Sequence, residues 1–139
     1  MALNTEHLGR SIQTLESALN FLNQSETGST EYDVYRIAAV KGFELTLEMS
    51  GKLLQKAIKP FFATSKMVDK LTFKDILRHA AKHDLLTLEE VERWFVYRDN
   101  RNLTAHDYGE GFAEETMALL PGFVADVKKL RETLDRADT

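Results

Sequence analysis

The spacing of apolar residues constrains this chain most, because it follows the period of an α-helix along nearly the whole length. Near the N-terminus, five apolar residues recur at intervals of four and three: Leu8, Ile12, Leu15, Leu19 and Leu22. This stripe predicts an amphipathic helix over about residues 4–24. No stretch of useful length alternates between apolar and polar residues as a half-buried strand would. The chain is therefore predicted to be all-α.

A second helix is predicted from Tyr32 to Lys59, after an N-cap at Thr30. Apolar side chains fall on most faces of this segment, so the helix should lie at the centre of the molecule. Gly42 and Gly51 lie inside it, where glycine is unfavourable, and we expect them to allow a neighbouring helix to approach closely. Pro60 should end the helix.

Three more helices complete the predicted set. Thr72 and Thr87 are each followed three residues later by an acidic residue, which is the signature of a helix start. The helix after Thr87 should run towards Asn102, and a last helical tract spans about 112–136, with Pro121 expected to kink or split it. The pattern predicts a five-helix, up-and-down antiparallel bundle.

Length and composition restrict the function classes. The 139 residues suit a single helical domain over residues 1–139, and the absence of cysteine excludes thiol catalysis and thiolate metal sites. No apolar run approaches the roughly 18–20 residues that span a bilayer, so we expect no membrane association and a cytoplasmic location. The net charge of -4 means that any binding of a polyanion must depend on a local cluster of basic residues.

The fourth predicted helix changes character near its end. Continuing its apolar face by steps of three and four leads to Arg98 and Arg101, so two guanidinium groups occupy positions expected to face the protein. Charged groups in such positions need partners. Glu44 and Glu48 share a face of the central helix, and we expect at least one of them to pair with one of these arginines.

Arg101 and His106 are five residues apart and would diverge on an unbroken helix, so the helix is predicted to end between them. Asn102 and the polar and glycine residues after it supply turn chemistry that could bring the two side chains together. An imidazole that moves a proton and a fixed cation that stabilises charge on phosphorus can cleave RNA without metal. The same two residues also suit a helix cap and a loop histidine.

The run from Arg101 to Tyr108 resembles the Arg-x-x-x-x-His-x-Tyr signature of HEPN toxins, which are paired with minimal nucleotidyltransferase antitoxins. Three further segments resemble the same family: Phe43–Glu48, Thr72–Leu77 and Leu119–Pro121. The resemblance extends over nearly the whole chain. This family is also described as nucleotidyltransferase substrate-binding proteins.

The resemblance implies a cofactor-free and metal-independent ribonuclease toxin, with RNA as substrate and tRNA as one candidate. It implies a homodimer in which two Arg101–His106 pairs face a shared cleft, with Arg98 orienting or supplementing Arg101. It also implies that the antitoxin attaches AMP to Tyr108, which would add negative charge and bulk beside the cationic site. A loop tyrosine could instead simply pack on the bundle.

Other interpretations remain open at this point. The chain could be a non-catalytic subunit that binds a nucleotide or substrate for a nucleotidyltransferase, with Arg101 and His106 holding phosphate. His79 and His83 are four residues apart, but no third metal ligand follows at fixed spacing, so a solvent-facing pair is expected. A set of lysines fits either of two roles, contact with an RNA backbone or cover of the solvent-facing surface: Lys52, Lys56, Lys59, Lys66 and Lys70.

Overall fold

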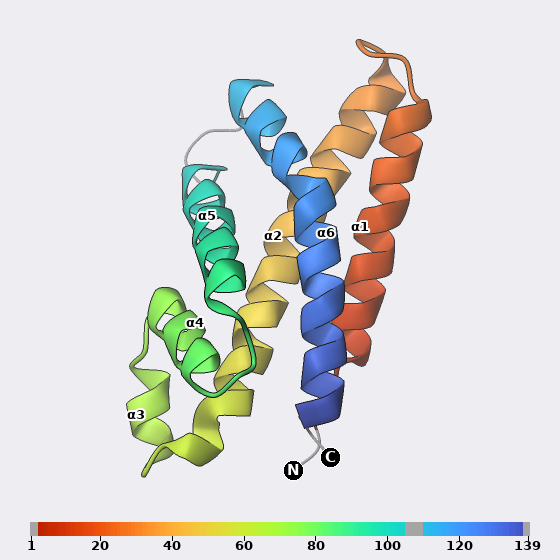
Figure 1. Ribbon diagram of the computed structural model, residues 1–139. Coiled ribbons are helices and arrows are strands. Elements are labelled where there is room, and N and C mark those ends of the chain that lie inside the picture. The colour runs from red at the N-terminus through yellow and green to blue at the C-terminus, as the bar shows by residue number, and fades with distance from the viewer. Residues whose placement is uncertain (1–2, 105–109, 138–139) are drawn as a thin grey trace.

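The computed structural model describes residues 3–104 and 110–137, and in these ranges it contains six α-helices, one 3-10 turn and no strand (Figure 1). The prediction of an all-α antiparallel bundle is confirmed. The elements in chain order are α1 (Glu6–Gln24), α2 (Thr30–Ile58), the 3-10 turn η1 (Lys59–Phe61), α3 (Ser65–Asp69), α4 (Phe73–Lys82), α5 (Leu88–Thr104) and α6 (Glu110–Ala137).

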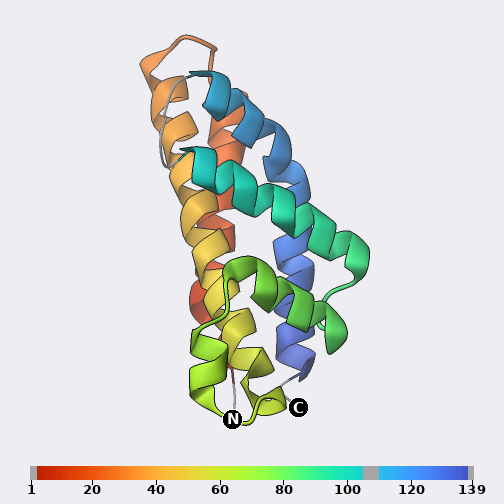
Figure 2. The ribbon, with the colours of Figure 1, turned by 90° about the vertical axis from the view of Figure 1, so that its left-hand side faces the viewer.

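The two longest helices and α1 form the body of the molecule. α1 and α2 make an antiparallel hairpin, and α6 packs against both (Figure 1). α4 and α5 cover another side of α2 and lie next to each other on the face shown in Figure 2. The start of α1 meets the end of α6, where the Thr5 hydroxyl donates a hydrogen bond to Asp135 over 2.6 Å. α2 contacts most of the other helices, as predicted for a central helix.

The predicted starts of two helices are confirmed by their capping contacts. The Thr72 hydroxyl accepts a hydrogen bond from the Asp75 amide at 3.1 Å, and α4 begins at the next residue. At the start of α5 the contact is reciprocal. The Glu90 amide donates to the Thr87 hydroxyl at 3.1 Å, and the Thr87 amide donates to the Glu90 carboxylate at 3.0 Å. These caps satisfy amide groups that the first helical turn leaves without helical partners.

The start of α2 differs by one residue from the prediction. Ser29, not Thr30, is the N-cap, since its backbone is extended and its hydroxyl accepts a hydrogen bond from the Tyr32 amide at 3.1 Å. Thr30 is already the first helical residue. Serine and threonine both cap helices well, so the sequence could not distinguish these neighbours.

The segment after Pro60 holds a short helix that the five-helix prediction omitted. Pro60 lies in η1, directly after α2 ends, and α3 then forms five residues further on. The Thr64 hydroxyl caps α3 by accepting from the Met67 amide at 3.3 Å. Val68 is the one residue of α3 that is buried. A helix of five residues with one apolar anchor leaves almost no periodic signal, which explains the omission.

Pro121 does not split the last helix. α6 is a single element with Pro121 inside it, and Figure 1 shows it bending in its N-terminal half. Proline removes one backbone donor and crowds the preceding turn, so a bend is expected at this position. Leu120 and Phe123 are fully buried on either side and hold both halves of the helix against the core.

An aromatic cluster fills the centre where α2, α5 and α6 meet. Phe123 packs edge to face against Phe43, Trp94 and Tyr97, with ring centroids 4.8, 5.6 and 5.1 Å apart. All four side chains are buried. Such edge-to-face pairs add about 0.5–1.5 kcal/mol each beyond the burial of apolar area. The middle of α5 is thus packed against α2 and α6.

The expected close approach at the glycines of α2 is confirmed. A methyl group on Gly51 would lie 2.6 Å from the ring of Phe73, and one on Gly42 would lie 3.4 Å from Leu15. At Gly51 the ring at the start of α4 therefore lies directly on the backbone of α2. This contact fixes the position of the α4 N-terminus relative to the central helix.

Candidate active site

Arg101 lies in the last turn of α5 and faces α2. Its Nη2 is 3.7 Å from Oε1 of Glu48, and the arginine side chain is 22% exposed. The Nε atom of Arg101 is buried. The expected pairing of an arginine with one of the two glutamates of α2 is therefore confirmed for Arg101 and Glu48. The guanidinium is thus partly exposed to solvent beside a half-exposed carboxylate.

The supporting residues named from the sequence lie on both sides of this pair. Glu44, one turn earlier on α2, is buried, and Lys41 reaches it over 3.7 Å. Arg98 places its guanidinium carbon 4.9 Å above the centroid of the Phe73 ring. Asn102 is exposed at the end of α5. The structure thus brings Arg98, Arg101 and Glu48 to one side of α5, with Glu44 beneath the surface.

Two of the predicted site residues, His106 and Tyr108, lie outside the described residues. The structure describes α5 as far as Thr104, so the expected end of this helix between Arg101 and His106 stays a prediction. The roles of Arg101, His106 and Tyr108 therefore remain predictions.

Hydrogen bonds also hold α5 against α6. Asp126 on α6 accepts two hydrogen bonds from Arg93, both at 2.8 Å, and one from the Tyr97 hydroxyl at 2.5 Å. One turn nearer the site, the Thr116 hydroxyl donates to the buried Asn100 side chain at 2.7 Å. Sequence reasoning missed this ladder of contacts, because its members are spread over two helices and no spacing rule connects them.

The contacts around Asp126 shift the pKa values of the Asp126 carboxyl and the Tyr97 hydroxyl in opposite directions. Burial acts against the charged form of Asp126, but the hydrogen bonds donated by Arg93 and Tyr97 outweigh it and lower the pKa of the carboxyl. Burial, together with the bond to Asp126, raises the pKa of the Tyr97 hydroxyl well above its ordinary value. The phenol therefore serves as a permanent donor to a permanent carboxylate at neutral pH.

A second feature missed from the sequence lies between α4 and α5. Lys74 and Arg78 both lie close to the ring of Phe95, with Nζ 5.4 Å and the guanidinium carbon 5.2 Å from its centroid. Both cations also contact carboxylates, Lys74 with Asp99 at 2.8 Å and Arg78 with Asp75 at 2.9 Å. The rings of Phe95 and Phe73 are only partly buried. No periodic pattern signals this arrangement, because each ring takes its cation from the other helix.

Residues 3–136 match the family described as nucleotidyltransferase substrate binding protein like. The chain belongs to this family. This match confirms the sequence resemblance at the level of the family.

Relatives of this family link the fold to two descriptions. A Haemophilus influenzae protein named "Probable ribonuclease HepT" is 29% identical over 102 residues, which cover 73% of this chain and 68% of the relative. A solved Haemophilus influenzae structure, described as the fold of a substrate binding domain of a nucleotidyltransferase, aligns with a TM-score of 0.80 at 26% identity over 94% of this chain and 98% of its own. A Thermus thermophilus structure aligns with a TM-score of 0.69 at 26% identity, over 89% of this chain and 98% of its own.

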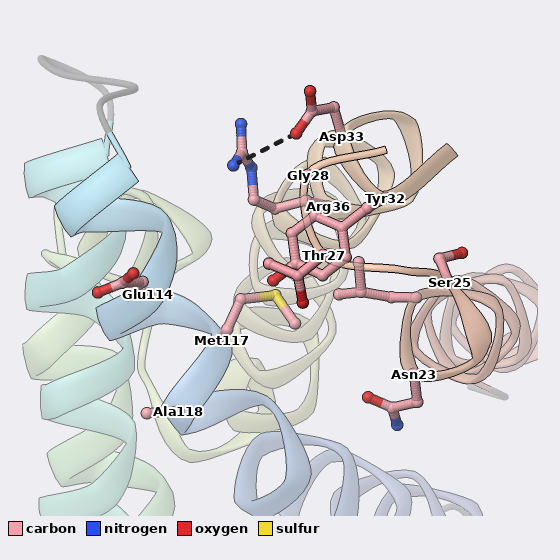
Figure 3. A pocket seen from close by; sticks show the side chains of 11 residues that line it. Asn23, Ser25, Thr27, Gly28, Tyr32, Asp33, Arg36, Glu114, Met117 and Ala118 are labelled. Carbon is pink, nitrogen blue, oxygen red and sulfur yellow. Dashed lines mark ion pairs between the residues drawn. The ribbon is translucent and has the colours of Figure 1, made fainter. Parts of the chain in front are cut away.

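A surface hollow of about 680 Å³ lies between the α1–α2 turn and α6 of this chain (Figure 3). Tyr32, Arg36 and Met117 line it, together with the turn residues around Gly28. In Figure 3 the side chains of Met117 and Tyr32 point toward each other, and Arg36 forms an ion pair with Asp33 at 3.6 Å. The volume lies within the range of small-molecule sites. Arg101 is not among the residues that line this hollow.

His79 of α4 and His83, the C-cap residue that follows this helix, make ring contacts and do not simply face solvent as expected. His83 stacks on Phe61 with ring centroids 3.7 Å apart, and His79 meets the edge of Phe62 at 4.8 Å. Within the described ranges, no group of three side chains of metal-ligating type comes together. In the same part of the chain, no helix is long and apolar enough to cross a bilayer.

Proposed function

We propose that this chain is the ribonuclease toxin of a two-component system, and that a nucleotidyltransferase neutralises it by attaching AMP to Tyr108. The proposal depends most on Arg101, a partly exposed guanidinium beside Glu48 in the last turn of α5, five residues before His106 in the segment that resembles the HEPN signature. The name of the Haemophilus influenzae relative supports the ribonuclease part of the proposal.

In the proposed reaction, His106 takes the proton from a ribose 2′-hydroxyl, and the oxygen attacks the adjacent phosphorus. The P–O5′ bond breaks, the leaving oxygen takes up a proton from solvent, and His106 releases its proton to solvent. The products are a 2′,3′-cyclic phosphate and a 5′-hydroxyl. Arg101 stabilises the negative charge that develops on the phosphoryl oxygens, and Arg98, one turn away, contacts the neighbouring phosphate. All of these groups come from the chain itself, so the reaction requires no metal.

The exposed face of α2 supports a homodimer as the functional form. Val34, Ile37 and Leu45 are 55%, 64% and 43% exposed, and helical phase places them on one face that ends at Glu48. A second copy seated on this face would bury the apolar stripe. It would also place the two Arg101 side chains at the edge of one interface, since Glu48 holds each of them there. The two sites would then share one cleft.

The proposed partner is a minimal nucleotidyltransferase, which the family description supports. In the inhibitory step the Tyr108 oxygen attacks the α-phosphorus of ATP, an O–P bond forms, and pyrophosphate leaves. The phosphodiester adds a negative charge seven residues after Arg101, where it would repel an RNA backbone and obstruct the site. Intact-mass analysis after co-expression should show one added adenylyl group, and the Tyr108→Phe variant should lack it.

Cleavage in the presence of a chelator tests the proposal. Purified wild-type protein is incubated with total RNA in excess chelator, beside the His106→Ala and Arg101→Ala variants and the control Arg10→Ala, an exposed arginine on α1. We expect cut or trimmed RNA with wild type and the control. In both site variants the rate of RNA cleavage should fall by about 100-fold or more. Equal cleavage by wild type and His106→Ala would remove the histidine from the mechanism.

The alternative function is a non-catalytic subunit that binds a nucleotide for a nucleotidyltransferase. The description of the aligned Haemophilus influenzae structure and the hollow lined by Tyr32 and Arg36 favour this candidate. Titration of ATP and AMP against wild type and Tyr32→Ala, beside the RNA cleavage assay, separates the nucleotide-binding subunit from the ribonuclease toxin. Saturable binding that is lost in Tyr32→Ala, without RNA cleavage by wild type, would support the subunit and contradict the toxin.

A further inference from the structure

Four cations form a continuous row over α4 and the C-terminal half of α5: Arg78, Lys74, Arg98 and Arg101. We refer to these four residues as the cation row. Arg78 and Lys74 share the ring of Phe95, and Lys74 bridges to α5 through Asp99. Arg98, beside Asp99, lies over Phe73, and Arg101 follows one helical turn later. Figure 2 shows the two helices that carry the row side by side on one face.

We propose that the cation row guides the backbone of single-stranded RNA across α4 and α5 to Arg101. This inference rests on the proposed ribonuclease function and extends it to the substrate-binding surface. The chain has a net charge of -4, so a polyanion needs a local set of cations to bind. The row provides this set, and it ends at the residue that would contact the phosphate at the cleavage position.

The two phenylalanine rings favour RNA over an acidic peptide. Phe73 and Phe95 are partly exposed, and each lies beside a guanidinium group. A cation held over a ring keeps its direction while its outer N–H groups stay available to phosphate. A partly exposed ring next to phosphate-binding groups also offers a face on which an unpaired base can stack, as in proteins that bind single strands. An acidic peptide would make no use of such faces.

The carboxylates along the row do not prevent this role. Lys74 and Asp99 are 39% and 58% exposed, and Arg78 and Asp75 are 59% and 41% exposed. Ion pairs this exposed contribute little to stability and are screened by salt, so a phosphate can replace the carboxylate at small cost. In the free protein the pairs hold the cations in place over the Phe95 ring. RNA binding would then exchange one anion for another.

Binding measurements on uncleaved RNA test the proposal. The His106→Ala protein serves as the background, and a labelled single-stranded oligoribonucleotide is titrated at several salt concentrations. We compare Lys74→Gln/Arg78→Gln with Lys128→Gln/Lys129→Gln, which removes two lysines of α6 that also contact carboxylates, Glu16 at 2.7 Å and Glu90 at 3.8 Å. The two double variants remove the same charge from different faces.

We expect the α4 variant to weaken binding about tenfold or more at low salt. The slope of log K against log salt should become shallower by about 1.4, because each phosphate contact on a single strand contributes about 0.7. The α6 variant should keep the background affinity and slope. A further variant, Phe95→Leu, should also weaken binding while leaving the net charge unchanged, and circular dichroism confirms that each variant is folded.

The outcomes separate this inference from the proposed function. RNA binding by the background protein that the α4 variant leaves unchanged would overturn the cation row and leave the nuclease proposal intact. Unchanged RNA binding with loss of the nucleotidyltransferase partner's binding would assign the row to a protein and also overturn the inference. If wild type neither binds nor cuts RNA, the proposed function itself fails.

Discussion

The hydroxyl of Tyr97 on α5 donates a hydrogen bond to the carboxylate of Asp126 on α6 over 2.5 Å, and both side chains are buried. Arg93 completes the contact with two hydrogen bonds to the same carboxylate. The arrangement provides the buried charge with donors from two side chains and connects the middle of α5 to α6. The bond between Asn100 and Thr116 continues the connection towards Arg101.

We expect Asp126→Asn to lower the free energy of unfolding at pH 7 by about 1–3 kcal/mol, because it weakens hydrogen bonds to a buried charged group. The pKa of Asp126 is lowered in the folded protein, so its contribution is fully present above the unfolded pKa of about 4. That contribution is lost as the pH falls through the folded pKa. Urea denaturation of both proteins between pH 7 and pH 3 should therefore show the difference shrinking in acid.

The matched control for this change is Asp33→Asn. Asp33 pairs with Arg36 at 3.6 Å, but its side chain is 54% exposed. Removing the charge of an exposed pair should change the free energy of unfolding by less than about 1 kcal/mol. A difference at Asp126 that stays constant from pH 7 to pH 3 would contradict the assigned role of its charge.

Thr116→Val tests whether the α5–α6 connection positions Arg101. The substitution keeps the volume of a fully buried side chain and removes the donor to Asn100, so the free energy of unfolding should fall by about 1–3 kcal/mol. If the bond also orients the end of α5, RNA cleavage should fall about tenfold at a temperature where the protein remains folded. Thr14→Val on the exposed side of α1 is the control and should change neither quantity. Normal cleavage by a destabilised Thr116→Val protein would restrict the bond to stability.

The apolar face of α2 predicts the effect of a charge on assembly. Ile37→Glu should convert the proposed dimer to a monomer in sedimentation, because a carboxylate buried at an apolar interface lacks a partner. Leu88→Glu is the control, since Leu88 is 77% exposed but lies at the start of α5. It should leave the dimer intact. Dimers of equal strength in both variants would rule out the α2 face as the contact.

The sequence allowed most of the architecture to be predicted. Helical spacing identified every long helix, and the caps at Thr72 and Thr87 located two helix starts to the residue. Gly51 was recognised as a point of close approach without its partner, Phe73, being known. These features depend on interactions within a few residues of one another, which a single sequence records directly.

The contacts around the candidate site were only partly predictable. Helical phase suggested that Arg101 needs a carboxylate, and Glu48 provides it. The same reasoning could not anticipate that Arg98 lies over Phe73, or that Asn100 bonds to Thr116. Each of these pairs joins helices that come together only through the packing of the whole bundle. Sequence spacing carries no information about such pairs, however strong the local pattern.

Glu48 offers a test of how Arg101 is held before RNA binds. The carboxylate is 48% exposed and 3.7 Å from the guanidinium, so it competes with phosphate for the arginine. In the His106→Ala background, Glu48→Gln should tighten RNA binding about two- to fivefold at low salt, and the gain should disappear at high salt. Glu16→Gln, which removes the partner of Lys128 on α1, is the control and should not change affinity. Weaker binding by Glu48→Gln would mean that the carboxylate is needed to position Arg101, and it would be incompatible with simple competition.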